Sequence, residues 1–195
     1  MGIEYEMKYR VTEPMLRQLR RAFPEEETLF SMETTYYDTP SGALAARHYT
    51  LRRRRENDIF VCTLKTPAAQ GGRREIEVCA QDIQTALPEL CKLSNDPELP
   101  QLLAEGIEPL CGAKFTRIAK TLTTPHNTLE LALDEGILTG GGRELPFREV
   151  EVELKDGPWD TAQRFAQALA LKFSLEEETR SKFYRAKLLA EGKGV

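Results

Sequence analysis

The stretch that decides the fold is IEYEMKYR, residues Ile3 to Arg10, in which charged side chains occupy every second position. Successive side chains of a β-strand point to opposite faces, so the charged residues from Glu4 onward would share one face. The residues between them are tyrosines and a methionine, which suit a strand and would form the other face. The alternation therefore predicts a strand with one charged and one largely apolar face.

The same alternation recurs along the chain, in TLRRRR, VCTLKT, RREIEV, LELALD and EVEVEL. The interleaved residues of the later strands are Val, Ile and Leu, which would form an apolar face. The residues that would share the charged face are Arg52, Arg54, Thr63, Lys65, Arg73, Glu75, Glu77, Glu130, Asp134, Glu149, Glu151 and Glu153.

Two arrangements satisfy this pattern. An open sheet would leave its charged face in water. A closed sheet would turn the charged face inward around a water-filled lumen and pack helices on its apolar outside. Three glutamates in a row, about 7 Å apart along one strand, favour the second arrangement because they repel one another unless a cation lies between them. The basic residues suit phosphate oxygens, to which guanidinium groups bind in pairs of hydrogen bonds.

Composition sets the remaining bounds. The 195 residues carry 27 basic and 31 acidic side chains, a net charge of −4 that gives no general affinity for nucleic acid or membranes. We expect one domain over residues 1–195 and a cytoplasmic location, since charge begins at Glu4 where a signal peptide needs an apolar core. The four cysteines lack zinc-like spacing and are expected to be free thiols.

Helices are expected at residues 12–23, in a proline-interrupted segment at 82–106, and at 159–173 and 176–189, from their apolar periodicity. Strands dominate the rest of the chain. The run Arg52 to Arg55 could form a nucleic-acid patch, but in a strand only two of its arginines share each face. His48 and His126 are isolated and are interpreted as surface residues, with no catalytic triad.

The opening Glu4-x-Glu6-x-Lys8 resembles the ExExK signature of the CYTH superfamily, the triphosphate tunnel metalloenzymes. Further motifs match in order along nearly the whole chain: YYDTP, LRRR, TLK, RREIEV, the strand around Arg117, ALD ending at Asp134, EVEVEL, and Ser181-Lys182. The resemblance implies an α+β fold, a closed eight-stranded antiparallel β-barrel with a charged interior and helices packed outside.

The resemblance also implies site residues. Glu4, Glu6 and Glu153, with Glu151 nearby, match carboxylates that bind Mg²⁺ or Mn²⁺, and Glu4, Glu6, Lys8 and Glu153 match the catalytic set. The residues that match the substrate-binding cations are Lys8, Arg52, Arg54, Lys65, Arg73, Arg117 and Lys182. Glu75, Asp134 and Glu149 match further inward acids.

The implied activity is metal-dependent hydrolysis of inorganic triphosphate to pyrophosphate and phosphate. Other family activities stay open, namely hydrolysis of thiamine or nucleoside triphosphates and adenylate cyclisation. A module that binds polyphosphate or nucleotide without catalysis also stays open, because it needs the same basic residues. Hydrolysis is favoured over simple binding because the chain keeps Glu4, Glu6 and Glu153.

Overall fold

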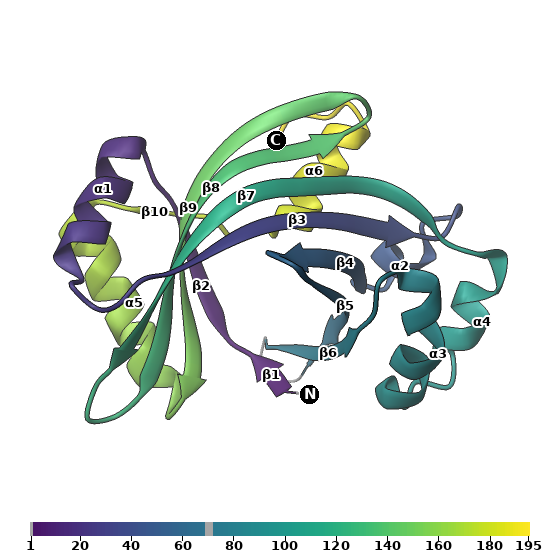
Figure 1. Cartoon of the computed structure of the whole chain (residues 1–195), viewed down its shortest axis with the longest axis horizontal. Helices are drawn as coiled ribbons and strands as arrows, with labels where there is room; N and C mark the ends of the chain where they lie inside the picture. The colour runs from purple at the N-terminus through teal and green to yellow at the C-terminus, as the bar shows by residue number, and fades with distance from the viewer. Residues whose placement is uncertain (1, 69–71) are drawn as a thin grey trace.

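The computed structural model describes residues 2–68 and 72–195. The fold is α+β, with one strongly curled antiparallel sheet (Figure 1). The strands are β1 (Gly2–Glu4), β2 (Glu6–Arg10), β3 (Thr28–Asp38), β4 (Thr50–Glu56), β5 (Ile59–Pro67), β6 (Arg73–Cys79), β7 (Glu108–Thr123), β8 (Thr128–Gly140), β9 (Arg143–Asp156) and β10 (Glu176–Glu177). Their order in the sheet is β1-β6-β5-β4-β3-β7-β8-β9-β2-β10.

Within residues 2–68 and 72–195 the sheet has ten strands, where the family resemblance implied eight. The first predicted strand is divided at Tyr5, and its two halves pair with different partners: β1 with β6, and β2 with β9. Tyr5 still contributes to the sheet, because its carbonyl accepts a hydrogen bond from the backbone amide of Leu154 at 2.9 Å. The N-terminal segment therefore links the two edges of the curled sheet. β1 is the strand at one edge, and β2 lies next to the strand at the other.

Helices cover the outer face of the sheet, as the apolar alternation predicted. The helices are α1 (Glu13–Ala22), α2 (Ala43–Ala46), α3 (Ile83–Ser94), α4 (Leu99–Leu102), α5 (Trp159–Phe173) and α6 (Lys182–Ala190), with a 3₁₀ turn at Leu103–Glu105. Leu19 of α1 and Ala166 of α5 pack with Val150 and Val152 of β9 in one buried cluster. Helix α3 packs in a second cluster with Leu64 of β5 and Ile76 of β6.

Helix α6 corrects the expectation that all helices lie outside. It packs against the charged-face side of the sheet, where Tyr36, Phe115 and Phe147 form an apolar patch at one end. By strand alternation, Phe115 shares a face with Arg117. The Tyr36 and Phe183 rings lie 5.2 Å apart between centroids. Because this end of the inner face is apolar, it binds the apolar side of a helix; Figure 1 shows α6 under the arch of β7, β8 and β9.

The expected helix over residues 176–189 was wrong at its start. Glu176 and Glu177 instead pair with β2, whose free edge offers backbone partners. The helix begins at Lys182 because the Ser181 side chain accepts the backbone N–H of Tyr184 at 3.1 Å, which caps its first turn. The segment 82–106 is helical as expected, although Pro88 lies inside α3 and does not end it.

None of the helices described is both long and apolar enough to cross a membrane. The four cysteines are free, as their spacing predicted.

Candidate active site

A cavity of about 890 Å³ lies on the inner face of the curled sheet, partly covered by α6. Its walls carry most of the residues that the sequence singled out. The predicted residues that line it are Glu4, Glu6, Lys8, Arg52, Arg54, Lys65, Arg73, Arg117, Glu151 and Lys182. Four predicted residues are not in its lining: Glu75, Asp134, Glu149 and Glu153. Seven strands thus deliver charged side chains to one space, together with α6.

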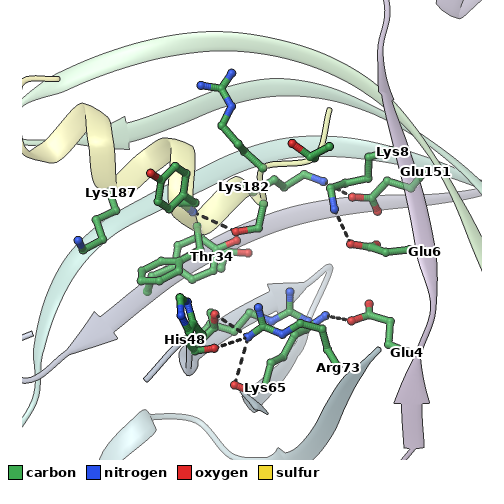
Figure 2. Close-up of a pocket in the computed structure, with 18 of the residues that line it drawn as sticks. Glu4, Glu6, Lys8, Thr34, His48, Lys65, Arg73, Glu151, Lys182 and Lys187 are labelled. Carbon is green, nitrogen blue, oxygen red and sulfur yellow. Dashed lines mark hydrogen bonds and ion pairs between the residues drawn. The ribbon is translucent and has the colours of Figure 1, made fainter. Parts of the chain in front are cut away.

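One side of the cavity is acidic and belongs to the N-terminal segment. Glu4 and Glu6 lie there with Lys8 and Glu151, whereas His48 and Lys187 lie at the opposite side (Figure 2). The Lys65 ammonium contacts Glu4 at 2.5 Å, and the Lys8 ammonium contacts Glu6 at 2.7 Å. Burial disfavours the charged form of Lys8, but the carboxylates of Glu6 and Glu151 outweigh it and raise the pKa of Lys8 above its ordinary value.

Glu153 lies next to this acidic side, although it is absent from the cavity lining. It is directly opposite Glu6 on β2 and opposite Glu130 on β8, so three glutamates form a row across three strands. The Lys155 ammonium contacts Glu153 at 2.8 Å and Glu130 at 3.6 Å. Burial raises the pKa of Glu153 in spite of Lys155, and the neighbouring carboxylates of Glu4 and Glu130 add to that rise.

The basic side of the cavity carries guanidinium groups that are only partly paired. The Nε atoms of Arg52, Arg54 and Arg73 are buried without a hydrogen-bond acceptor in the described part of the chain. Burial lowers the pKa of Arg54 below its ordinary value, and the positive charges of Arg52 and Arg117 lower it further. A buried N–H without a partner costs free energy, so these groups favour an anion in the cavity.

The run of four arginines divides as strand alternation predicts. Arg52 and Arg54 line the cavity, and Arg53 and Arg55 do not. Arg53 lies over the ring of Phe60 at 4.3 Å, and its Nε donates to the carbonyl of Gln81 at 2.7 Å. Arg55 Nε donates to the carbonyl of Asn57 at 2.7 Å. The outward arginines therefore bind protein groups on the other face of the sheet.

A cluster of ion pairs forms part of the cavity wall and extends into the interior beneath it. The Lys182 ammonium contacts Asp134 at 2.7 Å and Glu151 at 2.8 Å, and also contacts Glu149. Arg117 pairs with Asp134 and Glu151. Burial opposes ionisation of Glu151, but the neighbouring cations, led by Lys182 and Arg117, hold its pKa well below its usual range.

Asp134, Glu149 and Glu151 present carboxylate oxygens within 4.8 Å of one another, close enough to hold a metal ion. They form the one such group of three among residues 2–68 and 72–195. Their charge is already balanced, because Lys182, Arg117 and Arg185 contact them. In the described part of the chain, the predicted metal ligands Glu4, Glu6 and Glu153 do not form a group of three within that distance, and each contacts a lysine.

Glu75 occupies a bridging position between two cations of the basic side. It contacts Arg52 at 3.1 Å and Lys65 at 3.2 Å. Burial opposes its ionisation, but Lys65 and Arg52 lower its pKa below the ordinary value. Glu75 therefore orients two cavity-lining cations from behind.

A comparison of the chain with models of known protein families agrees with the order of these motifs. The model of the CYTH domain matches residues 2–186. The chain belongs to the CYTH domain family.

Two curated relatives of this CYTH domain are bacterial. The inorganic triphosphatase of Haemophilus influenzae is 29% identical over 167 residues, which cover 85% of this chain and 47% of that protein. The "Putative triphosphatase YjbK" of Bacillus subtilis is 28% identical over 191 residues, covering 94% of this chain and 93% of the relative. The chain thus spans about half the length of the first relative and nearly all of the second.

Solved structures share the CYTH fold at lower identity. HpAC1 from Hippeastrum, a "putative adenylyl cyclase" described with a dominant triphosphatase activity, superposes with a TM-score of 0.66 at 18% identity, covering 100% of this chain and 98% of that one. The PH1819 protein from Pyrococcus horikoshii OT3 gives 0.64 at 21% identity, with 97% and 99% covered. These similarities establish the fold.

Several residues that line the CYTH cavity were not found from the sequence. His48 is exposed, in agreement with its interpretation as a surface residue, but the sequence did not show that it also lines the cavity, where its backbone is left-handed with φ of 59°. Its carbonyl accepts a hydrogen bond from Arg73 at 3.0 Å. Lys187 lines the cavity from α6, and Tyr5 and Trp159 stack at 5.3 Å on its wall. That Lys187 lines the cavity could have been predicted only from the packing of α6 on the inner face of the sheet.

Proposed function

We propose that this CYTH domain hydrolyses inorganic triphosphate to pyrophosphate and phosphate in the cavity. Water supplies the oxygen that ends on the released phosphate, and the phosphoanhydride P–O bond breaks. The observation that carries the proposal is the set of buried, unpartnered Nε–H groups of Arg52, Arg54 and Arg73. The reaction type is supported by the inorganic triphosphatase of Haemophilus influenzae, whose sequence aligns with 85% of this chain.

The cavity cations are proposed to hold the triphosphate along its length. Guanidinium groups bind phosphate oxygens in pairs, and ammonium groups supply compact charge. The residues assigned this role are Lys8, Arg52, Arg54, Lys65, Arg73, Arg117 and Lys182. Lys182 is held in place by the buried carboxylates of Asp134, Glu149 and Glu151, so its side chain has a fixed position at the cavity wall.

We propose that Glu4, Glu6 and Glu153, with Glu151 nearby, hold Mg²⁺ or Mn²⁺. The donor chemistry fits, because hard cations select carboxylate oxygens. The tighter group formed by Asp134, Glu149 and Glu151 fits less well, because Asp134 and Glu149 are fully buried outside the cavity lining and the charge of the group is already balanced. A bound divalent ion would neutralise developing negative charge on the phosphate oxygens and orient them. Glu4, Glu6, Lys8 and Glu153 are the proposed catalytic set.

The sheet is proposed to work as a closed tunnel whose wall consists of the eight long strands predicted from the sequence. Support comes from the N-terminal segment, whose two halves pair with β6 and β9. Such closure places Glu4 and Glu6 across the cavity from the arginines of β4. The cytoplasmic location and the single-domain organisation stay predictions.

The test is a phosphate-release assay on the purified chain with inorganic triphosphate, pyrophosphate, thiamine triphosphate and ATP, each with Mg²⁺ or Mn²⁺. We expect triphosphate to be hydrolysed fastest. Pyrophosphate should be poor because it cannot reach the carboxylate side and the distal cations together. ATP is expected to be hydrolysed more slowly because the strand aromatics Tyr36 and Phe115 are only 4% and 6% exposed, which leaves only rings at the cavity margin, such as Tyr184 of α6, to contact a base. Preference for ATP, or binding without phosphate release, would contradict the proposal.

A second test addresses the metal ligands. Glu4→Gln, Glu6→Gln and Glu153→Gln should each lower kcat/KM for triphosphate roughly 100-fold or more, because each removes a negative ligand at constant size. Glu89→Gln, an exposed change on α3, is the matched control and should behave as wild type. Unchanged turnover in the three variants at saturating Mg²⁺ would refute the assignment.

A further inference from the structure

Each of the three principal carboxylates of the proposed metal site contacts a lysine. Glu4 contacts Lys65 at 2.5 Å, Glu6 contacts Lys8 at 2.7 Å and Glu153 contacts Lys155 at 2.8 Å. An ammonium group and a divalent cation repel each other at such distances, so the two cannot share one carboxylate without cost. Binding of a metal ion therefore requires these ammonium groups to move away.

The three lysines differ in where they can go. Lys8 and Lys65 line the cavity, so once displaced they can donate to the phosphate groups of the substrate. Lys155 does not line the cavity, and its side chain is 41% exposed. It also has a second acceptor, Glu130, at 3.6 Å. Lys155 can therefore leave Glu153 for Glu130 or for water without contributing to substrate binding.

The position of Lys155 on β9 explains how it reaches the acidic row. It lies two residues after Glu153, so the two side chains share the inner face of the strand. Glu130 faces Glu153 on β8, and Glu6 faces it on β2. Glu130, Glu153 and Glu6 thus form a row in which only Glu6 lines the cavity. Lys155 contacts the other two glutamates of this row.

We propose that Lys155 is a positioning residue that competes with the metal ion for Glu153 and so weakens the affinity of the site for divalent cations. This inference depends on the proposed function, since it takes Glu153 as a metal ligand. A partly exposed ion pair of this kind is worth little, so its loss should tighten metal binding by about two- to fivefold. The expected effect concerns metal affinity in the absence of substrate.

The test measures Mn²⁺ binding to the purified chain by isothermal titration calorimetry at low ionic strength, without triphosphate. Lys155→Met should bind Mn²⁺ about two- to fivefold more tightly than wild type. Lys155→Arg keeps the cation and should bind as wild type does. The matched control is Lys92→Met, which removes the same charge from an exposed lysine. Lys92 lies on α3, which packs on strands that are far from β9 in the strand order of the sheet. Lys92→Met should leave Mn²⁺ affinity unchanged.

Glu153→Gln separates the two levels of the inference. If Glu153→Gln weakens Mn²⁺ binding while Lys155→Met leaves it unchanged or weaker, the role of Lys155 is refuted and the metal site stands. If Glu153→Gln binds Mn²⁺ as tightly as wild type, the proposed ligand set fails, and the inference fails with it. Equal tightening in Lys155→Met and Lys92→Met would also refute it, because net charge alone would then explain the change. Lys155→Gln provides a second neutral variant, should Lys155→Met not fold.

Discussion

At the scale of single residues, the arginines of β4 show how one strand supplies two different environments. Arg52 and Arg54 each keep a buried Nε–H without an acceptor, whereas Arg53 and Arg55 each donate from Nε to a backbone carbonyl outside the cavity. Four consecutive residues of one type thus have two distinct environments, set only by the parity of their positions in the strand.

This parity predicts the outcome of four substitutions. Arg52→Ala and Arg54→Ala should lower triphosphate hydrolysis roughly 10- to 100-fold, because each lost charge-assisted contact to phosphate is worth about 1.5 to 3 kcal/mol. Arg53→Ala and Arg55→Ala, the matched controls, should stay within a few-fold of wild type. Steady-state kinetics measure the effect, and circular dichroism confirms folding. Equal losses at all four positions would contradict the inward-facing site.

Single residues were also where sequence predictions succeeded most. Alternation alone selected Arg52, Arg54, Lys65, Arg73 and Glu151 for the inner face, because a period of two is a property of any strand. It could not say that Glu149 would be fully buried and paired with Arg185, because that depends on where α6 packs. Nor could it show that lysines would contact the proposed metal ligands.

Helix α6 is the element on which the cavity depends and the one predicted least well. Its apolar residues suggested an outer helix, since periodicity indicates which face is buried and not against which side of a sheet. In the structure it brings Lys182 and Lys187 to the cavity and inserts Arg185 beneath it. Its approach to the sheet is close at Gly140 of β8, where a Cβ atom would lie 2.6 Å from the carbonyl oxygen of Ala186.

Gly140→Ala should therefore displace α6. The added methyl group meets helix backbone, also at the amide nitrogen of Ala190 at 2.8 Å, so the helix must shift as a unit. We expect a loss of about 1 to 3 kcal/mol in the free energy of unfolding and reduced hydrolysis, since Lys182 moves with the helix. Gly194→Ala, where a Cβ has nothing within 4 Å, is the control. Thermal denaturation measures the effect. If Gly140→Ala and Gly194→Ala both melted at the wild-type temperature, the close contact between Gly140 and α6 would be contradicted.

At the scale of the whole molecule, the fold brings oppositely charged side chains from both ends of the strand order into one cavity. The N-terminal segment supplies Glu4 and Glu6 from one direction, and β4, β5 and β6 supply Arg52, Lys65 and Arg73 from another. The identity of the strands could be predicted from the sequence, but their order could not, because β1 and β6 are paired across some 70 residues of chain. Such non-local pairing leaves no local pattern.

The arginines of β4 and β6 that line this cavity predict that substrate alone stabilises the protein. With EDTA present, triphosphate should still bind the basic side, because the guanidinium groups of Arg52, Arg54 and Arg73 lie on the cavity wall and need no metal to bind phosphate. A ligand that binds only the folded state adds about 2.7 kcal/mol to the free energy of unfolding at a concentration 100 times its Kd. The melting temperature should therefore rise with triphosphate concentration in wild type and in Arg55→Ala, and rise less in Arg54→Ala at the same concentrations. Differential scanning fluorimetry at constant ionic strength measures this shift, with sulfate as a control for general salt effects. An equal rise in Arg54→Ala and Arg55→Ala would show that triphosphate binds elsewhere, because of these two arginines only Arg54 lines the cavity in which we propose that the anion is bound and hydrolysed.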